Sequence, residues 1–180
     1  SDGSIVAIGA AYNDNNGSDA GYVRIFQRDE NNTTIDPTGW SQLGDDIEGE
    51  AAWDNAGYSV SLSSDGSIVA IGAWSNDSPD GTTPRLWNSG HVRVYKYNNG
   101  AWGKLGNDIQ GEIWSNSGKS VSLSSDGSIV AIGAAEHDAN GDPASNNYDN
   151  TGRVSIYEYN GSNTWNLLAA DIAGIWFAFF

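Results

Sequence analysis

One ten-residue phrase, SDGSIVAIGA, occurs three times in this chain of 180 residues, beginning at Ser1, Ser64 and Ser125. Other phrases keep the same spacing, such as GHVRVY from Gly90 and GRVSIY from Gly152. The chain is therefore about three copies of one unit of about 61 residues. Such a period is typical of repeat folds, in which each copy buries its faces against its neighbours.

Each copy is expected to form four β-strands. In the middle copy, residues 58–63 alternate between serine and larger side chains, which predicts a half-buried strand, and an Asp-Gly pair then predicts a hairpin turn. Residues 68–73 are nearly all apolar, as in a central strand that is covered on both faces. After a variable polar loop, residues 91–97 form the expected third strand and residues 102–109 the outermost one.

Four strands per copy at this period predict an all-β, β-propeller-type repeat of about three four-stranded antiparallel blades. A β-prism of three sheets around a threefold axis is the alternative. The expected units of the single repeat domain, 1–180, are blade A at 1–56, which lacks its first strand, blade B at 57–117, blade C at 118–174 and an apolar terminal strand at 175–180.

Three motifs stand at matching places in the copies. GYSV begins at Gly57, the pair Gly-Ala recurs at Gly72 and Gly133, and GHVRVY begins at Gly90. These motifs resemble the Phe-Gly-x-Ser-Val, Gly-Ala-Pro and Gly-x-Val-x-Val-Tyr elements of the FG-GAP-like repeats of bacterial surface proteins, which are related to the propeller of integrin α-subunit heads. The resemblance spans nearly the whole chain and implies a propeller fold. Integrin-type blades often carry an Asp-rich calcium loop in the first hairpin, where this chain has only SSDGS.

The charge of the chain limits its partners. Asp and Glu number 23 against 8 Lys and Arg, a net charge of −15, which argues against nucleic acid because phosphate binding needs clustered cations. No apolar run reaches the roughly 18–20 residues of a membrane span. The sequence contains no zinc-protease, serine-hydrolase or phosphate-loop motif, and His91 and His137 are expected at the surface, so no catalytic function is predicted.

The loops that follow the second strands carry oxygen ligands at the close spacing that calcium uses. The candidate calcium ligands are Asp14, Asn16, Asp138 and Asn140. They lack a full Asp-x-Asp-x-Asp-Gly pattern, and Asn and Asp also form such turns without metal by hydrogen-bonding their own backbone. Calcium is the one candidate cofactor.

The tryptophans divide by whether they repeat. Those at the start of each fourth strand are expected in the blade cores: Trp40, Trp102 and Trp165. Two others precede first strands and two belong only to the long loop of the middle copy, and these four are the candidate ligand or interface residues: Trp53, Trp114, Trp74 and Trp87. They would stack on a glycan, contact another subunit or pack within their loops.

Sequons for N-glycosylation fall in predicted loops. The asparagines in these sequons are Asn16, Asn31, Asn32, Asn76 and Asn160. Their placement fits a glycoprotein that is secreted or on the cell surface.

The first copy begins at its second strand, and the apolar segment IWFAFF falls where a fourth copy would begin. Three blades are fewer than the roughly four to eight that usually close a propeller. The chain is therefore expected to be part of a larger propeller, or to associate with further copies in a ring or a head-to-tail filament. The candidate strand-exchange residues are Ile175, Trp176, Phe177, Phe179 and Phe180, and packing under the last blade is the alternative for them.

Together these features predict a non-catalytic, extracellular structural or adhesive repeat protein. Its expected partners are copies of itself and a glycan or protein ligand. The rival hypothesis is a glycan-binding, lectin-like propeller or a propeller enzyme with an active site on its loop face, since fold does not fix function.

Overall fold

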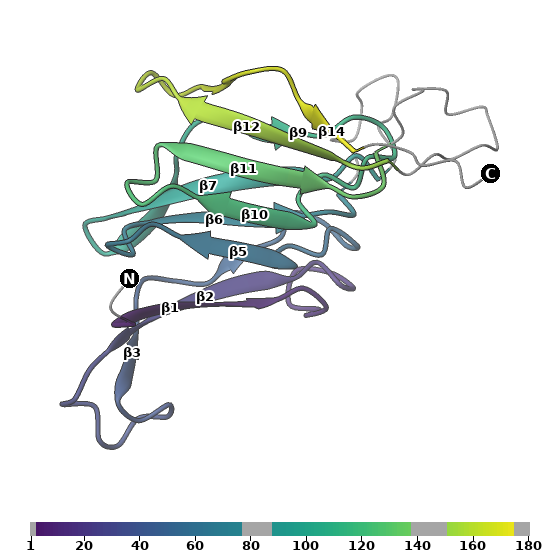
Figure 1. The fold of residues 1–180 in the computed structure, drawn as a ribbon. Helices are drawn as coiled ribbons and strands as arrows, with labels where there is room; N and C mark the ends of the chain where they lie inside the picture. Colours follow the sequence, from purple (N-terminus) through teal and green to yellow (C-terminus); the bar gives the residue numbers. More distant parts are fainter. Residues whose placement is uncertain (1–2, 77–87, 138–150, 175–180) are drawn as a thin grey trace, which may run out of the picture.

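The computed structural model describes residues 3–76, 88–137 and 151–174. Over these ranges the chain forms fourteen β-strands and no helix. The strands build three antiparallel sheets, with the middle sheet between the other two (Figure 1). This confirms the predicted all-β fold of three blades. Within the described ranges there is accordingly no helix long and apolar enough to span a membrane.

Each sheet follows the order of the sequence. The first sheet contains β1 (Ile5–Ala10), β2 (Tyr22–Arg28), β3 (Trp40–Gln42) and β4 (Ile47–Glu48). The middle sheet contains β5 (Ser59–Leu62), β6 (Ile68–Ala73), β7 (His91–Asn98), β8 (Ala101–Lys104) and β9 (Ile109–Gln110). The third sheet contains β10 (Ser120–Leu123), β11 (Ile129–Ala134), β12 (Arg153–Tyr159), β13 (Trp165–Leu167) and β14 (Ile172–Ala173).

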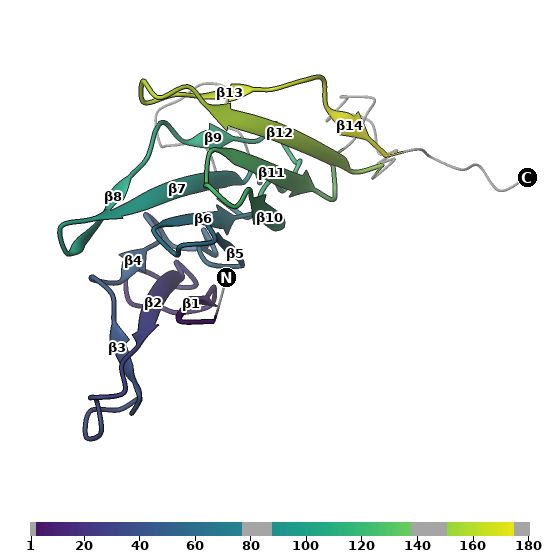
Figure 2. The same cartoon turned by 60° about the vertical axis from the view of Figure 1, so that its left-hand side comes forward.

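The sheets touch in series. The first sheet meets the middle one through β1 and β5, and the third sheet meets the middle one through β10, which lies against β5 and β6. Figure 2 shows the same order from a second direction. A series of this kind favours neighbouring blades over a prism, in which the first and third sheets would also pack together.

The prediction of a single outermost strand at 102–109 was wrong. The segment forms two short strands, β8 and β9, which pair with different parts of β7. Between them the Leu105 N–H donates to the Val94 carbonyl at 2.7 Å, and Gly106 then takes a left-handed φ of 86°. The first sheet breaks in the same way at Gly44, with a φ of 74°. The third sheet also breaks here, between β13 and β14, where the Leu168 N–H donates to the Ile156 carbonyl at 2.8 Å and Ala169 follows. The leucine hydrogen bond is therefore common to the three breaks, whereas the left-handed glycine, which has no steric cost in this conformation, belongs to the first two.

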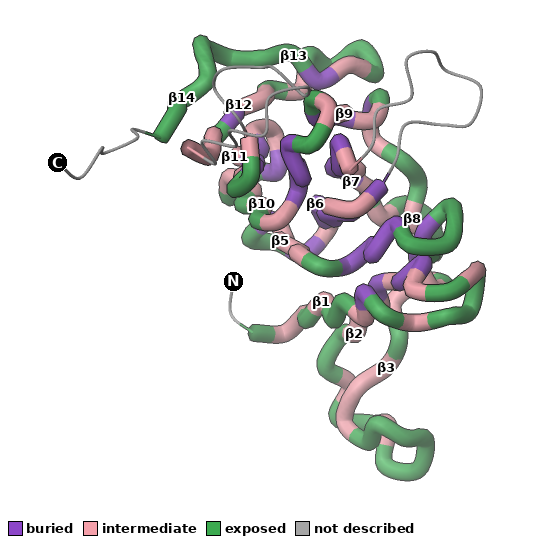
Figure 3. Tube along the Cα trace, turned by 90° about the vertical axis from the view of Figure 1, so that its right-hand side faces the viewer, coloured by how far each residue is buried: buried purple, intermediate pink, exposed green. Residues whose placement is uncertain are grey.

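The central strand of the middle sheet, β6, is buried on both faces, as its apolar sequence predicted (Figure 3). Val69 and Ile71 of β6 pack with β2 of the first sheet. Ile68 and Ala70 alternate with them and pack with β11 of the third sheet. Fully burying an aliphatic side chain of this size contributes about 1.5–3 kcal/mol, so neighbours on both sides are needed to stabilise β6.

Within residues 3–76, 88–137 and 151–174, no further sheet covers the outer faces of the two terminal sheets. Val6 and Ile8 of β1 are 36% and 50% exposed, whereas the corresponding residues of β6 are 0% and 4% exposed. On the third sheet Ile172 is 61% exposed, whereas its middle-sheet counterpart Ile109 is 4% exposed. The same repeat positions are therefore core between sheets and surface at the ends of the series.

A tryptophan ties each sheet to the one before it. The Trp102 indole Nε1 donates to the Leu43 carbonyl at 2.6 Å, and the Trp165 indole Nε1 donates to the Leu105 carbonyl at 2.7 Å. Each acceptor precedes the left-handed glycine that turns the chain out of the β ladder. Both indoles pack with the hydrophobic clusters between sheets, so the prediction that they lie in the blade cores is confirmed for these two.

The glycines of the strand breaks also leave room for the indoles. A Cβ atom added at Gly106 would lie 2.6 Å from Trp165 Cδ1, and one at Gly44 would lie 2.8 Å from Trp102 Cδ1. The third copy has Ala169 at this position. Ala169 is not left-handed, so the third sheet does not repeat the conformation in which the other two sheets seat an indole.

Gly106→Ala tests this fit, with Gly100→Ala as the matched control. Gly100 is also left-handed, with a φ of 89°, but no atom lies within 4 Å of an added Cβ. We expect both variants to lose about 1–2 kcal/mol of unfolding free energy through backbone strain. Gly106→Ala should lose about 1–3 kcal/mol more, because the indole must shift. Equal losses in urea unfolding would show that the indole does not depend on this glycine.

Candidate functional site at the junctions between sheets

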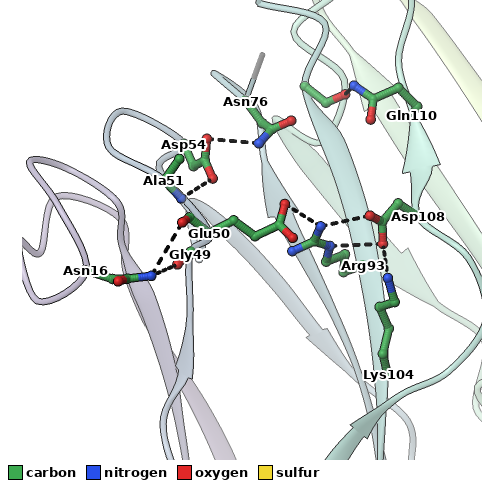
Figure 4. Close-up of polar contacts among 11 residues, drawn as sticks. Asn16, Gly49, Glu50, Ala51, Asp54, Asn76, Arg93, Lys104, Asp108 and Gln110 are labelled. Carbon is green, nitrogen blue, oxygen red and sulfur yellow. Dashed lines mark hydrogen bonds and ion pairs between the residues drawn. The ribbon is translucent and has the colours of Figure 1, made fainter. Parts of the chain in front are cut away.

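At the junction of the first and middle sheets, Arg93 of β7 lies between two carboxylates (Figure 4). Its Nη2 is 2.5 Å from Glu50 Oε2 and 2.8 Å from Asp108 Oδ2. The Lys104 Nζ is 2.9 Å from Asp108 Oδ1. Glu50 lies in the connector that leaves the first sheet, whereas the other three residues belong to the middle copy. The cluster therefore joins the connector of one sheet to the strands of the next.

The charges of this cluster are compensated. Burial opposes ionisation of Asp108, but hydrogen bonds from Arg93 and Lys104 outweigh it and lower the pKa of Asp108 to about 2. Burial likewise opposes the charge on Arg93, and its hydrogen bonds to Asp108 and Glu50 raise its pKa. Pairing of this kind is what a largely buried ion needs. Asp108 stays ionised at neutral pH and is not poised to transfer a proton.

The junction of the middle and third sheets builds a similar contact from other residues. The Arg153 Nη1 donates to Glu112 Oε1 at 2.8 Å, and the His137 Nε2 lies 2.9 Å from Glu112 Oε2. Arg153 also lies 3.2 Å from Asp171 of its own copy. The hydrogen bond from Arg153, and a weaker one from His137, lower the pKa of Glu112 against an opposing effect of burial.

The two arginines come from different repeat positions. Arg153 stands two residues before Ser155, which is the counterpart of Arg93 in the third copy. Residues i and i+2 of a strand point to the same face of a sheet. Either position can therefore present a guanidinium to the connector glutamate. The repeat conserves the contact rather than the residue.

His91 is not at the surface as predicted. It is 5% exposed at the junction of the first two sheets. Burial, followed by the charge of Arg93, lowers the pKa of His91 from 6.5 to about 4. The cavity that it lines has a volume of about 10 Å³, which is space for about one water molecule. The His137 side chain is also largely covered, at 13% exposure.

The candidate calcium ligands in the first loop contribute to its local structure. The Asp14 Oδ1 accepts a hydrogen bond from the Asp19 N–H at 2.9 Å, and the Asn16 Nδ2 donates to the Gly49 carbonyl at 2.7 Å. Within the described ranges, no three His, Asp or Glu side chains are grouped as a metal site would require. Calcium binding at Asp14 and Asn16 remains a prediction.

The hairpin that takes the place of an integrin-type calcium loop is closed by its own serines. The Asp65 Oδ1 accepts from the Ser63 hydroxyl at 2.6 Å and from the Ser67 N–H at 3.0 Å. These bonds lower the pKa of Asp65, with the Ser63 hydroxyl as the largest cause. The third copy repeats the arrangement around Asp126. The single carboxylate of each hairpin thus stabilises a turn.

Three of the candidate binding tryptophans lie in the described part of the chain, and these three do not form one cluster. The Trp74 ring packs edge-on against Tyr58, with centroids 5.7 Å apart, and the Lys119 Nζ lies 4.8 Å from its centroid. Trp53 and Trp114 lie in the connectors and are 62% and 40% exposed. Their φ values of 73° and 61° are unusual for bulky residues, and such strain is often kept at functional positions.

The sequon asparagines differ in access. Asn76 is 5% exposed, and its Nδ2 donates to Oδ1 of the buried Asp54 at 2.9 Å. A glycan on this nitrogen is therefore incompatible with the observed packing. The Nδ2 atoms of Asn16 and Asn32 donate to backbone carbonyls. Asn31 and Asn160 are exposed. Of the predicted acceptors, these last two are the best placed for modification.

The connector glutamates were not predicted from the sequence, although it contains a signal for them. The Gly-Glu pair recurs at Glu50 and Glu112, and the third copy replaces it with Gly174-Ile175. Some predicted site residues lie outside the described ranges: Asp138, Asn140, Trp87, Ile175, Trp176, Phe177, Phe179 and Phe180.

No protein-family model and no curated protein matches this chain. Its function is therefore inferred from the geometry of the junctions and of the uncovered faces.

His91→Gln tests the electrostatics of the first junction. Between pH 6.5 and about 4, the unfolded chain binds a proton at His91 that the folded chain does not. This group therefore contributes stability that is complete above pH 6.5 and is lost as the pH falls through that window. The parent should lose on the order of 3 kcal/mol more than His91→Gln across it. Parallel curves of unfolding free energy against pH would contradict the burial of a neutral His91.

Proposed function

We propose that this chain is a non-catalytic structural or adhesive repeat protein, secreted or on the cell surface, that assembles with further blades of its own kind. The observation that carries this proposal is the outer face of β1. Val6 and Ile8 are exposed there, although the same repeat positions are core at both junctions between sheets. Exposed apolar positions of this kind mark a contact surface.

Polar groups on the same side of the first sheet support the proposal. Arg24 is the counterpart of Arg93 and pairs with Asp46 at 2.7 Å, but its side chain is 40% exposed where that of Arg93 is 11% exposed. In the described part of the chain, no connector glutamate lies against Arg24 as Glu50 lies against Arg93. A blade that packed on β1 and carried the Gly-Glu pair of the first two copies would bring one.

Other features support the adhesive and extracellular parts of the proposal. Trp53 and Trp114 present indole surface next to the junctions, and exposed aromatic rings suit stacking on a glycan or contact with a protein. Asn31 and Asn160 offer exposed sequons. The resemblance to FG-GAP-like repeats points the same way.

Ile8→Lys tests the assembly, with Ile35→Lys as the control. Ile35 is 72% exposed in the loop between β2 and β3, away from the outer face of β1. We expect the parent to self-associate through the β1 side, and Ile8→Lys to weaken this association because a charge would be buried at the contact. Ile35→Lys should behave like the parent in sedimentation measured over a range of concentrations. A parent that stays at the mass of one chain throughout would contradict the proposal.

A further inference from the structure

Among the strands that the structure describes, the first sheet has an open edge where the other sheets have a strand. β5 and β10 occupy this place in the middle and third sheets, whereas β1 is the edge of the first. In the middle sheet the Gly57 N–H donates to the Gly72 carbonyl at 3.1 Å, and the third sheet repeats this bond. The counterpart of Gly72 on β1 is Gly9. Its carbonyl stands at the open edge of β1.

Neighbouring strands at this place are joined by serine side chains. The Ser59 hydroxyl of the middle sheet donates to the Gly118 carbonyl at 2.6 Å. The Leu123 N–H of β10 donates to the Ser61 hydroxyl at 3.0 Å. Ser59 and Ser61 of β5 thus hydrogen-bond the backbone of β10 and of the residues just before it. These bonds link the first strand of the middle sheet to the first strand of the third sheet.

A first strand added to the first sheet would place its serines against β5 and the connector before it, as the serines of β5 lie against β10. The counterparts of the Gly118 carbonyl and the Leu123 N–H are the Gly57 carbonyl and the Leu62 N–H. The Gly57 carbonyl borders a surface depression lined by residues 9–13 and 57–58. The groove therefore has the edge of β1 on one side and, where this depression lies, the connector that leads into β5 on the other.

The groove restricts the size of the side chains that enter it. In the middle sheet the Ser59 Oγ lies 2.4 Å from the position of a Cβ atom added at Gly72, and in the third sheet the Ser120 Oγ lies 2.2 Å from one added at Gly133. At this point a serine is packed directly over glycine backbone. The matching glycine on β1 is Gly9, so a small hydroxyl side chain fits there and a phenyl ring does not.

We propose that the groove between β1 and β5 binds one extended strand with serine at alternate positions, the Ser-Val-Ser-Leu pattern of β5 and β10. The inference rests on the proposed assembly with further blades and names the segment that such a blade contributes. Backbone hydrogen bonds to β1 would provide affinity, and the serines would set the register against β5. The segment 175–180, IWFAFF, offers no serine for these contacts.

The test extends the full chain before Ser1 with AGYSVSLS, a copy of residues 56–63. Because Ser1 corresponds to Ser64, this extension recreates the first hairpin of the middle copy. The Arg28 N–H donates to the Ser4 carbonyl. The backbone N–H and C=O groups of even-numbered residues in β1 therefore point toward β2, and those of odd-numbered residues point toward the groove. We expect hydrogen exchange at the amides of Ala7 and Gly9 to slow by about tenfold or more. The amides of Val6 and Ile8 serve as internal controls and should change little.

A matched extension, AGYFVFLS, keeps a strand-forming pattern but replaces the two serines that correspond to Ser59 and Ser61 with phenylalanine. It should leave exchange at Ala7 and Gly9 as in the parent. Equal protection by the two extensions, or protection by neither, overturns the proposal. So does faster exchange at these two amides when the parent is shortened to end at Gly174, because the segment 175–180 would then be the occupant.

The same samples separate this inference from the proposed function. If Ile8→Lys weakens association but AGYSVSLS gives no protection, the assembly stands and the serine strand is excluded. If AGYSVSLS protects Ala7 and Gly9 while the parent never associates, the groove is assigned and the assembly is excluded.

Discussion

The whole structure depends on one constraint: a sheet that is apolar on both faces is stable only between two others. β6 meets this constraint with six consecutive buried residues, and its alternating side chains belong to two different cores. The indole of the following sheet and the left-handed glycine that receives it then fix how far each sheet slides over the next. Apolar burial supplies most of the free energy, and the directional bonds select one arrangement.

The ionic contacts at the two junctions show how a repeat can drift in sequence and keep its geometry. One junction places a guanidinium at Arg93 with a buried neutral His91 beside it, and the other places it at Arg153. Both arginines pair with a glutamate from the preceding connector, because side chains two residues apart in a strand point to the same face of the sheet. Removing one member would leave the others buried without compensation, so such sets are expected to change together.

The repeat made the architecture predictable and left the junction chemistry hidden. Identical phrases gave the number of sheets and the central strand, because hydrophobic pattern reports how many faces are covered. The break between β8 and β9 occurs where the Leu105 N–H bonds to the Val94 carbonyl, and the burial of His91 depends on a neighbouring sheet. A strand pattern predicts neither of them. The pairing of Glu112 with Arg153 was also hidden, since aligning the copies sets that arginine against a histidine.

The two ends of this series of sheets are not interchangeable. Gly44 and Gly106 each leave room for an indole from the next sheet, whereas the third copy has Ala169 at this position. Ala169 is not left-handed as the two glycines are. A further sheet on that face would therefore meet a different backbone at the point where its tryptophan enters, so the two outer faces are expected to differ in what they accept.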